Sequence, residues 1–419
     1  MFSKAFGKRY SKPNEDQGGS TRTMNCIFCG SELNGSTKPE HILPNALGGR
    51  MTTRRAICSK CNNNFGGTID KKLTSQIEVI RNLLQLSSGT GKSPPGLRNI
   101  SAGSQKINFR NDGTPELTGK PFEIEYSDDG VATVLITARS QEELQKHIPN
   151  IAEQLRISPD ELLKQINAED VSYVTEPVEQ VHHRLSLGGE EMLRSVVKSC
   201  LVLWSTHVGN DEVSSPTFED ARNFVTKGQD AFSRNRIQMD SRLLPCNEAL
   251  TSKFGDIINL IYISSDNDGR LIGHFTMFNA IGWQIVLSEG GASSNSSIGL
   301  ISNPLRPSDW SNKVASEFNV EFSWLAAANF ESFDDVQRRF SKVIALHFEM
   351  GRPRVISKII NDICEEYDLS EDQHIPEEIR EQVLAEVSER LAFFALRLPH
   401  SRALSPAELK KLLGSNQAS

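Results

Sequence analysis

The spacing of hydrophobic residues changes at one place near the N-terminus and divides the chain there. Before it, apolar residues recur at helical spacing and predict a helix over residues 71–87. These residues are Leu73, Ile77, Ile80 and Leu84. The run that follows is rich in Gly, Ser and Pro, which predicts a linker over residues 87–98.

Beyond this linker the pattern mixes strands with helices. Residues 121–138 alternate around Asp129-Gly130, which predicts a β-hairpin. The other predicted strands lie in residues 256–265 and 270–289, and the predicted helices follow Ser140 and Ser158 and cover residues 189–208, 333–350 and 376–398. The helix over 189–208 is largely apolar, which predicts that it is buried. The fold class is therefore α+β, with a small N-terminal domain and a larger mixed α+β body over residues 99–419, long enough for two subdomains.

Composition narrows the class of protein. Hydrophobic residues make up 37% and charged residues 24%, which is typical of a soluble globular protein. No stretch reaches the roughly 20 apolar residues that span a bilayer. Residues 1–23 are polar and lack the apolar core of a secretory signal, so we predict that they form a flexible basic arm. A cytoplasmic protein without membrane contact is the expectation.

The net charge of −7 is unevenly distributed. Residues 1–92 hold 14 Lys and Arg against 6 Asp and Glu, a net charge of +8. The remaining residues hold 32 against 47, a net charge of −15. A basic segment on an acidic body indicates that polyanion binding is confined to the N-terminal part, although a solvated basic tail would give the same count.

Four of the seven cysteines form two C-x2-C pairs that are separated by 28 residues, namely Cys26, Cys29, Cys58 and Cys61. Two such pairs can supply four thiolates to one tetrahedral Zn²⁺, and the alternative is four unrelated thiols. A four-thiolate site has no open position, which predicts a structural zinc. Zinc binding can add on the order of 10 kcal/mol to the folding of so short a unit. The scattered Cys200, Cys246 and Cys364 are expected in the core.

Between the cysteine pairs the sequence reads Glu40-His41-Ile42-Leu43-Pro44, and Asn62 follows the last cysteine. These motifs resemble the HNH endonuclease superfamily, in the form with cysteine pairs on either side of an E-H-I-x-P motif. The resemblance covers the N-terminal part alone. It implies a ββα-metal fold, a β-hairpin followed by a helix, in an HNH nuclease domain over residues 24–86.

The resemblance also implies roles for four residues. Glu40, the acid before the histidine, would bind a divalent metal ion, and Asn62 would be the second protein ligand. His41 would be the general base. Thr53 stands where the family has an asparagine that orients this histidine, a departure that a threonine hydroxyl could offset in part. Glu40 is a second departure, because the usual acid is aspartate.

The chemistry of these residue types fits such a site. Adjacent strand residues point to opposite faces, so Glu40 and His41 are expected to approach a phosphate from two sides. Carboxylate and amide oxygens suit Mg²⁺ or Mn²⁺, which would stabilise the charge growing on the phosphate. An imidazole with a pKa near ~6.5 is a competent base at neutral pH. The products would carry a 5′-phosphate and a 3′-hydroxyl.

Each residue also has a structural alternative. His41 could be a zinc ligand or a structural residue, and Glu40 could pair with Arg50 or Arg54. Asn62 could cap the following helix. Secondary ligands or caps could come from Asn63, Asn64 and Asp70. A basic group could contact phosphates: Arg50, Arg54, Arg55, Lys60, Lys71 and Lys72.

These observations predict a metal-dependent endonuclease that acts on DNA. An uncontrolled nuclease would harm its own host, which motivates a regulatory or target-sensing body and a role in defence against foreign DNA. The alternative, favoured by Thr53, is a zinc-stabilised nucleic-acid-binding module without catalysis. The sequence leaves open a ligand or protein partner for the body and a homo-oligomer.

Overall fold

The structure is a computed structural model. It describes residues 24–103, 105–118, 120–136, 141–165, 172–175, 185–245, 247–316, 320–370, 374–398 and 400–403. The predicted basic arm over residues 1–23 and the predicted core position of Cys246 lie outside the described residues. Within these ranges, no helix combines the length and the apolar character that crossing a membrane requires.

The N-terminal part consists of two short hairpins and three helices. Strand β1 (Met24–Asn25) pairs with β2 (Glu32–Leu33), and β3 (Glu40–His41) pairs with β4 (Thr52–Thr53), both antiparallel. The remaining elements are η1 (Asn45–Leu47), α1 (Ser59–Gly67), α2 (Ile69–Gln76) and α3 (Glu78–Leu83). The β3–β4 hairpin followed by α1 confirms the predicted order of a β-hairpin and a helix.

The single helix predicted over residues 71–87 is wrong, because the chain forms α2 and α3 instead. They meet at Ile77, whose backbone (φ −109°, ψ 8°) leaves the helical region. The Ile77 amide donates to the carbonyl of Thr74, which closes α2 with a tight turn. The predicted apolar face is nevertheless confirmed, since Leu73, Ile77, Ile80 and Leu84 are all buried.

A six-stranded antiparallel sheet forms the centre of the body, in the order β11-β14-β13-β12-β15-β16. Its strands are β11 (Ile237–Asp240), β12 (Asn259–Ser265), β13 (Leu271–Met277), β14 (Ile281–Ser288), β15 (Ser297–Ser302) and β16 (Trp310–Ser311). The strands predicted in residues 256–265 and 270–289 are thereby confirmed. Every residue of β12, β13 and β14 is buried, so both faces of the sheet are covered.

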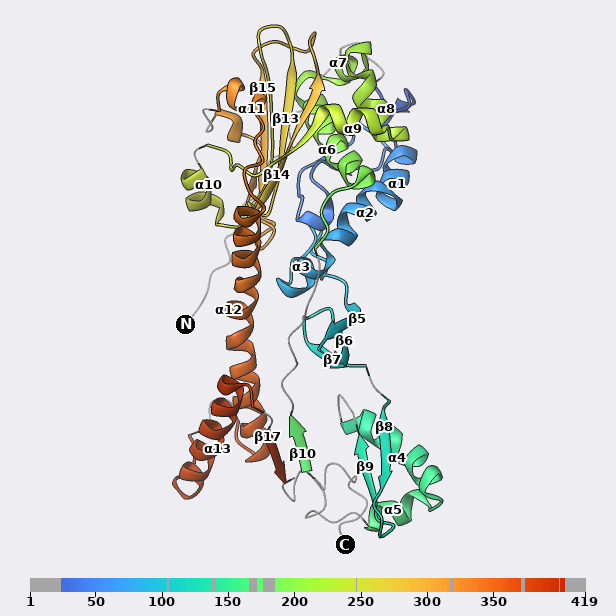
Figure 1. Ribbon diagram of the computed structural model, residues 1–419, viewed down its shortest axis with the longest axis vertical. Helices are drawn as coiled ribbons and strands as arrows, with labels where there is room; N and C mark the ends of the chain where they lie inside the picture. The colour runs from blue at the N-terminus through green and yellow to red at the C-terminus, as the bar shows by residue number, and fades with distance from the viewer. Residues whose placement is uncertain are drawn as a thin grey trace.

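Helix α6 (Glu190–Val208) covers one face of this sheet, and α10 (Asn247–Phe254) and α11 (Phe322–Ala326) lie on the other side (Figure 1). Successive residues of β12 point to opposite faces: Ile261 belongs to the cluster under α6, and Tyr262 belongs to the cluster under α11. Twelve residues of α6 are buried, which confirms the predicted buried helix.

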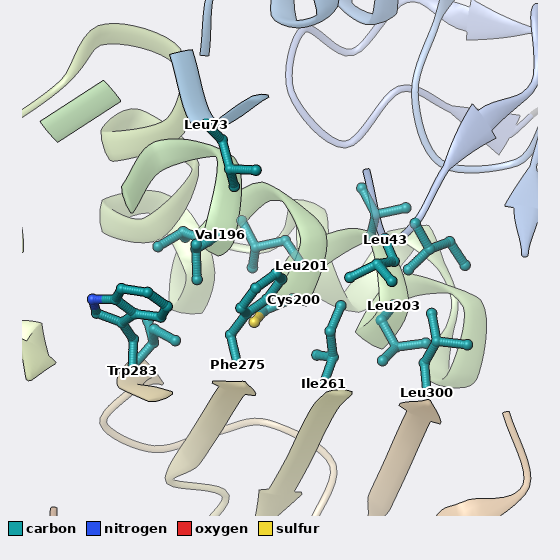
Figure 2. Close-up of a cluster of buried hydrophobic side chains, with 14 of the residues drawn as sticks. Leu43, Leu73, Val196, Cys200, Leu201, Leu203, Ile261, Phe275, Trp283 and Leu300 are labelled. Atoms are coloured by element: carbon teal, nitrogen blue, oxygen red, sulfur yellow. The ribbon is translucent and has the colours of Figure 1, made fainter. Parts of the chain in front are cut away.

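One hydrophobic core joins the N-terminal part to the body. Figure 2 shows Leu73 of α2 on one side of α6 and Ile261 and Phe275 of the sheet on the other. Leu43, from the loop between β3 and β4, enters the same cluster beside Leu203 of α6. The N-terminal part therefore packs on α6, and α6 packs on the sheet.

The predicted linker over residues 87–98 lies against the loop between β3 and β4. Gly89 donates its amide hydrogen to the carbonyl of Asn45 and accepts a hydrogen bond from the Arg50 guanidinium. A side chain at Gly89 would collide with the carbonyl oxygen of Gly49, so this close approach requires glycine. The boundary between the two parts stays a prediction.

Smaller units complete the described chain. Around α6 lie α7 (Asn210–Ser214), η3 (Pro216–Phe218), α8 (Glu219–Lys227) and α9 (Asp230–Arg236), and η4 (Val314–Ser316) follows β16. Below α3 lies a three-stranded sheet of β5 (Leu97–Ala102), β6 (Gln105–Phe109) and β7 (Pro115–Leu117). The predicted hairpin is confirmed as β8 (Phe122–Tyr126) and β9 (Ala132–Ile136), and the two helices predicted after it are α4 (Gln141–Leu155) and α5 (Pro159–Gln165).

One long helix extends from the sheet to the opposite end of the molecule, where a second long helix lies beside it (Figure 1). Helix α12 (Phe333–Glu366) runs from the sheet to α13 (Glu377–Leu396), near which β17 (His400–Ala403) pairs with β10 (Ser172–Thr175). Both helices were predicted. Helix α12 continues past the predicted end at residue 350 and through Pro353.

Candidate functional site

Four thiols gather at the start of the N-terminal part. The Sγ atoms of Cys26, Cys29, Cys58 and Cys61 all lie within 4.8 Å of one another. This spacing and an all-sulfur donor set fit a tetrahedral zinc ion. His41 is not a member of this cluster.

Local backbone structure brings the two cysteine pairs together. Gly30 adopts φ +72° in the turn between β1 and β2, and its amide donates to the carbonyl of Cys26. Cys58 is the N-cap of α1, where its Sγ accepts a hydrogen bond from the amide of Cys61. Phe28 packs edge-on against Phe65 of α1, with ring centroids 5.0 Å apart. The thiol cluster thus fixes α1 against the first hairpin.

His41 lies on β3, outside the thiol cluster, and its side chain is half-buried. Burial lowers the pKa of His41, and the positive charges of Lys198, Arg50 and Lys38 lower it further. The imidazole is therefore neutral at neutral pH, which is the form that can accept a proton.

Glu40 precedes His41 on β3 and is buried, with 4% of its surface exposed. Its Oε1 accepts a hydrogen bond of 2.6 Å from Nζ of Lys198 on α6. The same Nζ donates to Oδ2 of Asp70 at 2.5 Å. Burial raises the pKa of Glu40, and the Lys198 ammonium opposes that effect. The predicted alternative partners of Glu40, Arg50 and Arg54, instead donate to the backbone carbonyls of Gly89 and Thr37.

Asn62 lies in α1, and its side chain reaches the start of β3. Its Nδ2 donates to the carbonyl of Pro39 at 3.1 Å and to that of Lys38 at 3.5 Å. Both bonds use the amide nitrogen, so the amide oxygen keeps its lone pairs for a ligand. Asn62 is thereby held next to the strand that carries Glu40 and His41.

Thr53 pairs with Glu40 across the β3–β4 hairpin, and Thr52 pairs with His41. The Thr53 hydroxyl accepts a hydrogen bond of 3.1 Å from the amide of Arg55. The threonine directly opposite His41 is therefore Thr52.

The basic residues near the site fall into two groups. The charged ends of Arg50 and Arg54 bond backbone carbonyls, and Lys72 lies 4.0 Å from Glu191. The side chains of Arg55, Lys60 and Lys71 are exposed. Lys38, just before β3, is exposed as well, and exposed cations of this kind suit contacts with a phosphate backbone.

Sequence reasoning missed Lys198, Ser195 and their connection to Asp70. A lysine in an apolar, buried helix is a recognisable signal, because lysine is almost never fully buried unless it is paired. Its partners lie 128 and 158 residues away along the chain. The local pattern therefore could not identify them.

Residues 26–78 match the family model described as HNH endonuclease. The comparison with curated proteins and the comparison with solved structures found no match. The family resemblance of the N-terminal part is thereby confirmed. The match ends within α3, before the body begins.

Proposed function

From the HNH endonuclease domain over residues 26–78, we propose that this chain is a metal-dependent endonuclease that hydrolyses phosphodiester bonds of DNA, with His41 as the general base. The observation that carries the proposal is the environment of His41. Its half-buried imidazole has a lowered pKa, and the charges of nearby cations contribute to this shift. The buried carboxylate of Glu40 precedes it on the same strand, and the Asn62 carboxamide is bonded to Pro39 just before that strand.

His41 removes a proton from a water molecule as that water attacks the phosphorus atom. The new phosphorus–oxygen bond forms while the bond to the 3′ oxygen breaks, and the leaving oxygen takes a proton from solvent. The products carry a 5′-phosphate and a 3′-hydroxyl. Exposed cations near β3 bind the flanking phosphates and orient the strand for this attack.

Glu40 and Asn62 are the residues that would hold the divalent ion. Each has an oxygen that the hydrogen bonds described above leave unused, Oε2 of Glu40 and Oδ1 of Asn62. Such hard oxygen donors fit Mg²⁺ or Mn²⁺. A bound ion would stabilise negative charge on the phosphate and on the leaving oxygen.

The body is proposed to control when or where the domain cuts. Its helix α6 contacts Glu40 directly, so a change in the body reaches the site through one side chain. Such control suits a nuclease that acts in the cytoplasm against foreign DNA.

The test is nicking of supercoiled plasmid by the zinc-loaded full chain with Mg²⁺ or Mn²⁺. Replacing His41 by alanine should lower the nicking rate by about 10²-fold or more, the contribution of a general base. His374→Ala, at an exposed histidine of the body, is the matched control and should nick at the wild-type rate.

Equal rates for wild type and His41→Ala would contradict the catalytic proposal. Binding of DNA that weakens steeply with salt, with no nicking under either metal ion, would indicate the non-catalytic binding module.

A further inference from the structure

Lys198 is an ammonium group in the interior, shared between two carboxylates of the N-terminal part. Its side chain is 1% exposed, against 6% for Glu40 and 19% for Asp70. Both ion pairs are short, at 2.6 and 2.5 Å. Two carboxylates around one ammonium offset the cost of burying its charge.

Ser195 extends this network by one residue. It lies one turn before Lys198 on α6, and its hydroxyl donates to Oδ1 of Asp70 at 2.6 Å. Both oxygens of Asp70 are therefore engaged, Oδ1 by Ser195 and Oδ2 by Lys198. Asp70 thus pairs with Lys198 and has no unbonded oxygen left for another ligand.

Lys198 bonds one oxygen of Glu40 and one oxygen of Asp70. The hydrogen bond from Lys198 fixes Oε1 of Glu40, which leaves its other oxygen, Oε2, as the candidate ligand atom. Groups that bond a ligating carboxylate in this manner set its orientation and tune the affinity for the metal ion.

We propose that Lys198, supported by Ser195 and Asp70, is a positioning residue for the divalent metal site, so that the body completes the site of the nuclease domain. This inference rests on the proposed function, because it assigns Glu40 as a ligand. Lys198 touches neither the metal ion nor the DNA. It acts by holding Glu40 in one rotamer.

Two other roles for Lys198 predict different results. A purely structural ion pair would stabilise the contact between α6 and the N-terminal part without affecting metal binding. An ammonium that competes with the metal ion would weaken binding, so that its removal would strengthen it. The direction of the change in metal affinity therefore separates the three roles.

The experiment measures Mn²⁺ binding to the zinc-loaded full chain by the electron paramagnetic resonance signal of free Mn²⁺. Lys198→Met should raise the Kd for Mn²⁺ by about 10- to 100-fold, the range for loss of a group that supports a metal ligand. Lys72→Met is the matched control, because Lys72 makes an exposed ion pair at the same contact between α2 and α6. Its Kd should equal that of wild type.

Ser195→Ala is measured in parallel, because it removes one hydroxyl and leaves no buried charge unpaired. It should raise the Kd about fivefold, the equivalent of one hydrogen bond. An unchanged or lower Kd in folded Lys198→Met overturns the proposal. If Lys198→Met does not fold, an unchanged Kd in Ser195→Ala overturns it.

Wild type and Glu40→Gln distinguish this inference from the proposed function. If wild type binds no Mn²⁺, the proposed metal site is wrong and the role of Lys198 falls with it. If wild type binds Mn²⁺, Glu40→Gln loses it, and the Lys198 and Ser195 variants retain wild-type affinity, only the role of Lys198 is wrong.

Discussion

Asp240, at the end of β11, is a carboxylate with no exposed surface. The Arg242 guanidinium bonds both of its oxygens, at 2.9 and 2.7 Å, and itself lies over the ring of Trp324. Nε2 of His274 lies 3.5 Å from Oδ2. Burial alone would raise the pKa of Asp240, but His274 and Arg242 outweigh it and hold the pKa well below its ordinary value. The ionised form of Asp240 therefore stabilises the fold.

This shift predicts how the stability of the body depends on pH. A lowered pKa in the folded state gives stability that is present above the pKa of the unfolded chain, about 3.9, and is lost as the pH falls below it. Asp240→Asn should therefore lower the free energy of unfolding by about 3 kcal/mol at pH 7, and the difference from wild type should shrink below about pH 4. Denaturant unfolding at a series of pH values measures this.

Asp230→Asn is the control for Asp240→Asn, because Asp230 forms a surface pair with Arg234 in which both side chains are about three-quarters exposed. The free energy of unfolding of the Asp230→Asn variant should differ little from that of wild type at any pH. A constant difference between wild type and Asp240→Asn down to pH 3 would contradict the assignment.

At the scale of single residues, site residues could be predicted from the sequence where the members of one site lie close together along the chain. The thiols and the Glu40-His41 pair could be located because ligands of one site follow one another at short spacings. Lys198 and Asn259 could not be located, because their partners come from the N-terminal part through the tertiary fold. Asn259, for example, donates to the carbonyl of Leu47 at 2.9 Å.

At the scale of elements, the thiol cluster holds β1, β2 and α1 together. These strands have two residues each and bury little surface of their own. Their arrangement therefore depends on the zinc ion that the four thiols fit. Because α1 carries Asn62, the metal site proposed above depends on the thiol cluster as well.

Replacing Cys61 by serine should remove zinc, lower the Tm of the full chain and lower plasmid nicking. We expect the free energy of unfolding to fall by several kcal/mol, about half or more of the stabilisation that structural zinc gives to small units. Zinc content by atomic absorption and unfolding by calorimetry check this.

Cys364→Ser, at a half-buried cysteine of α12, should leave zinc content and nicking unchanged. Full zinc content in Cys61→Ser would show that the four thiols do not form the site.

The sequence predicted that the two long helices exist, but it did not predict where the first one ends. The first amphipathic helix was predicted to end at residue 350, yet α12 continues through Pro353 to Glu366. There the Arg390 guanidinium of α13 bonds Glu366 at 2.8 Å. Packing of α12 against α13 thus overrides a local signal that would end an isolated helix.

At the scale of the whole molecule, one hydrophobic core joins the N-terminal part and the body, which the sequence pattern separates. Leu43 and Leu73 belong to the same cluster as Leu203 and Phe275. The basic N-terminal part and the acidic body could be separated by composition and by the run of Gly, Ser and Pro. The contact between them could not be predicted, because it pairs apolar positions that look like the ordinary core of each part.

This shared core predicts that the N-terminal part and the sheet unfold together. Calorimetry of the zinc-loaded full chain should give one transition for these two parts. Substituting alanine for Leu73 or for Phe275 should lower the midpoint temperature of this one transition, because both side chains lie against α6. Two transitions, only one of which shifts with each variant, would contradict this.

The β3–β4 loop lies close to the ends of β12 and β15, which has a consequence for protein engineering. Gly48 lies against Pro304, and its carbonyl accepts a hydrogen bond of 3.1 Å from Ser302. A chimera that transplants only the cysteine-rich N-terminal part into another protein would lose these contacts with Pro304 and Ser302. A graft that retains these contacts must also carry α6 and the β12–β15 pair, continued to Pro304.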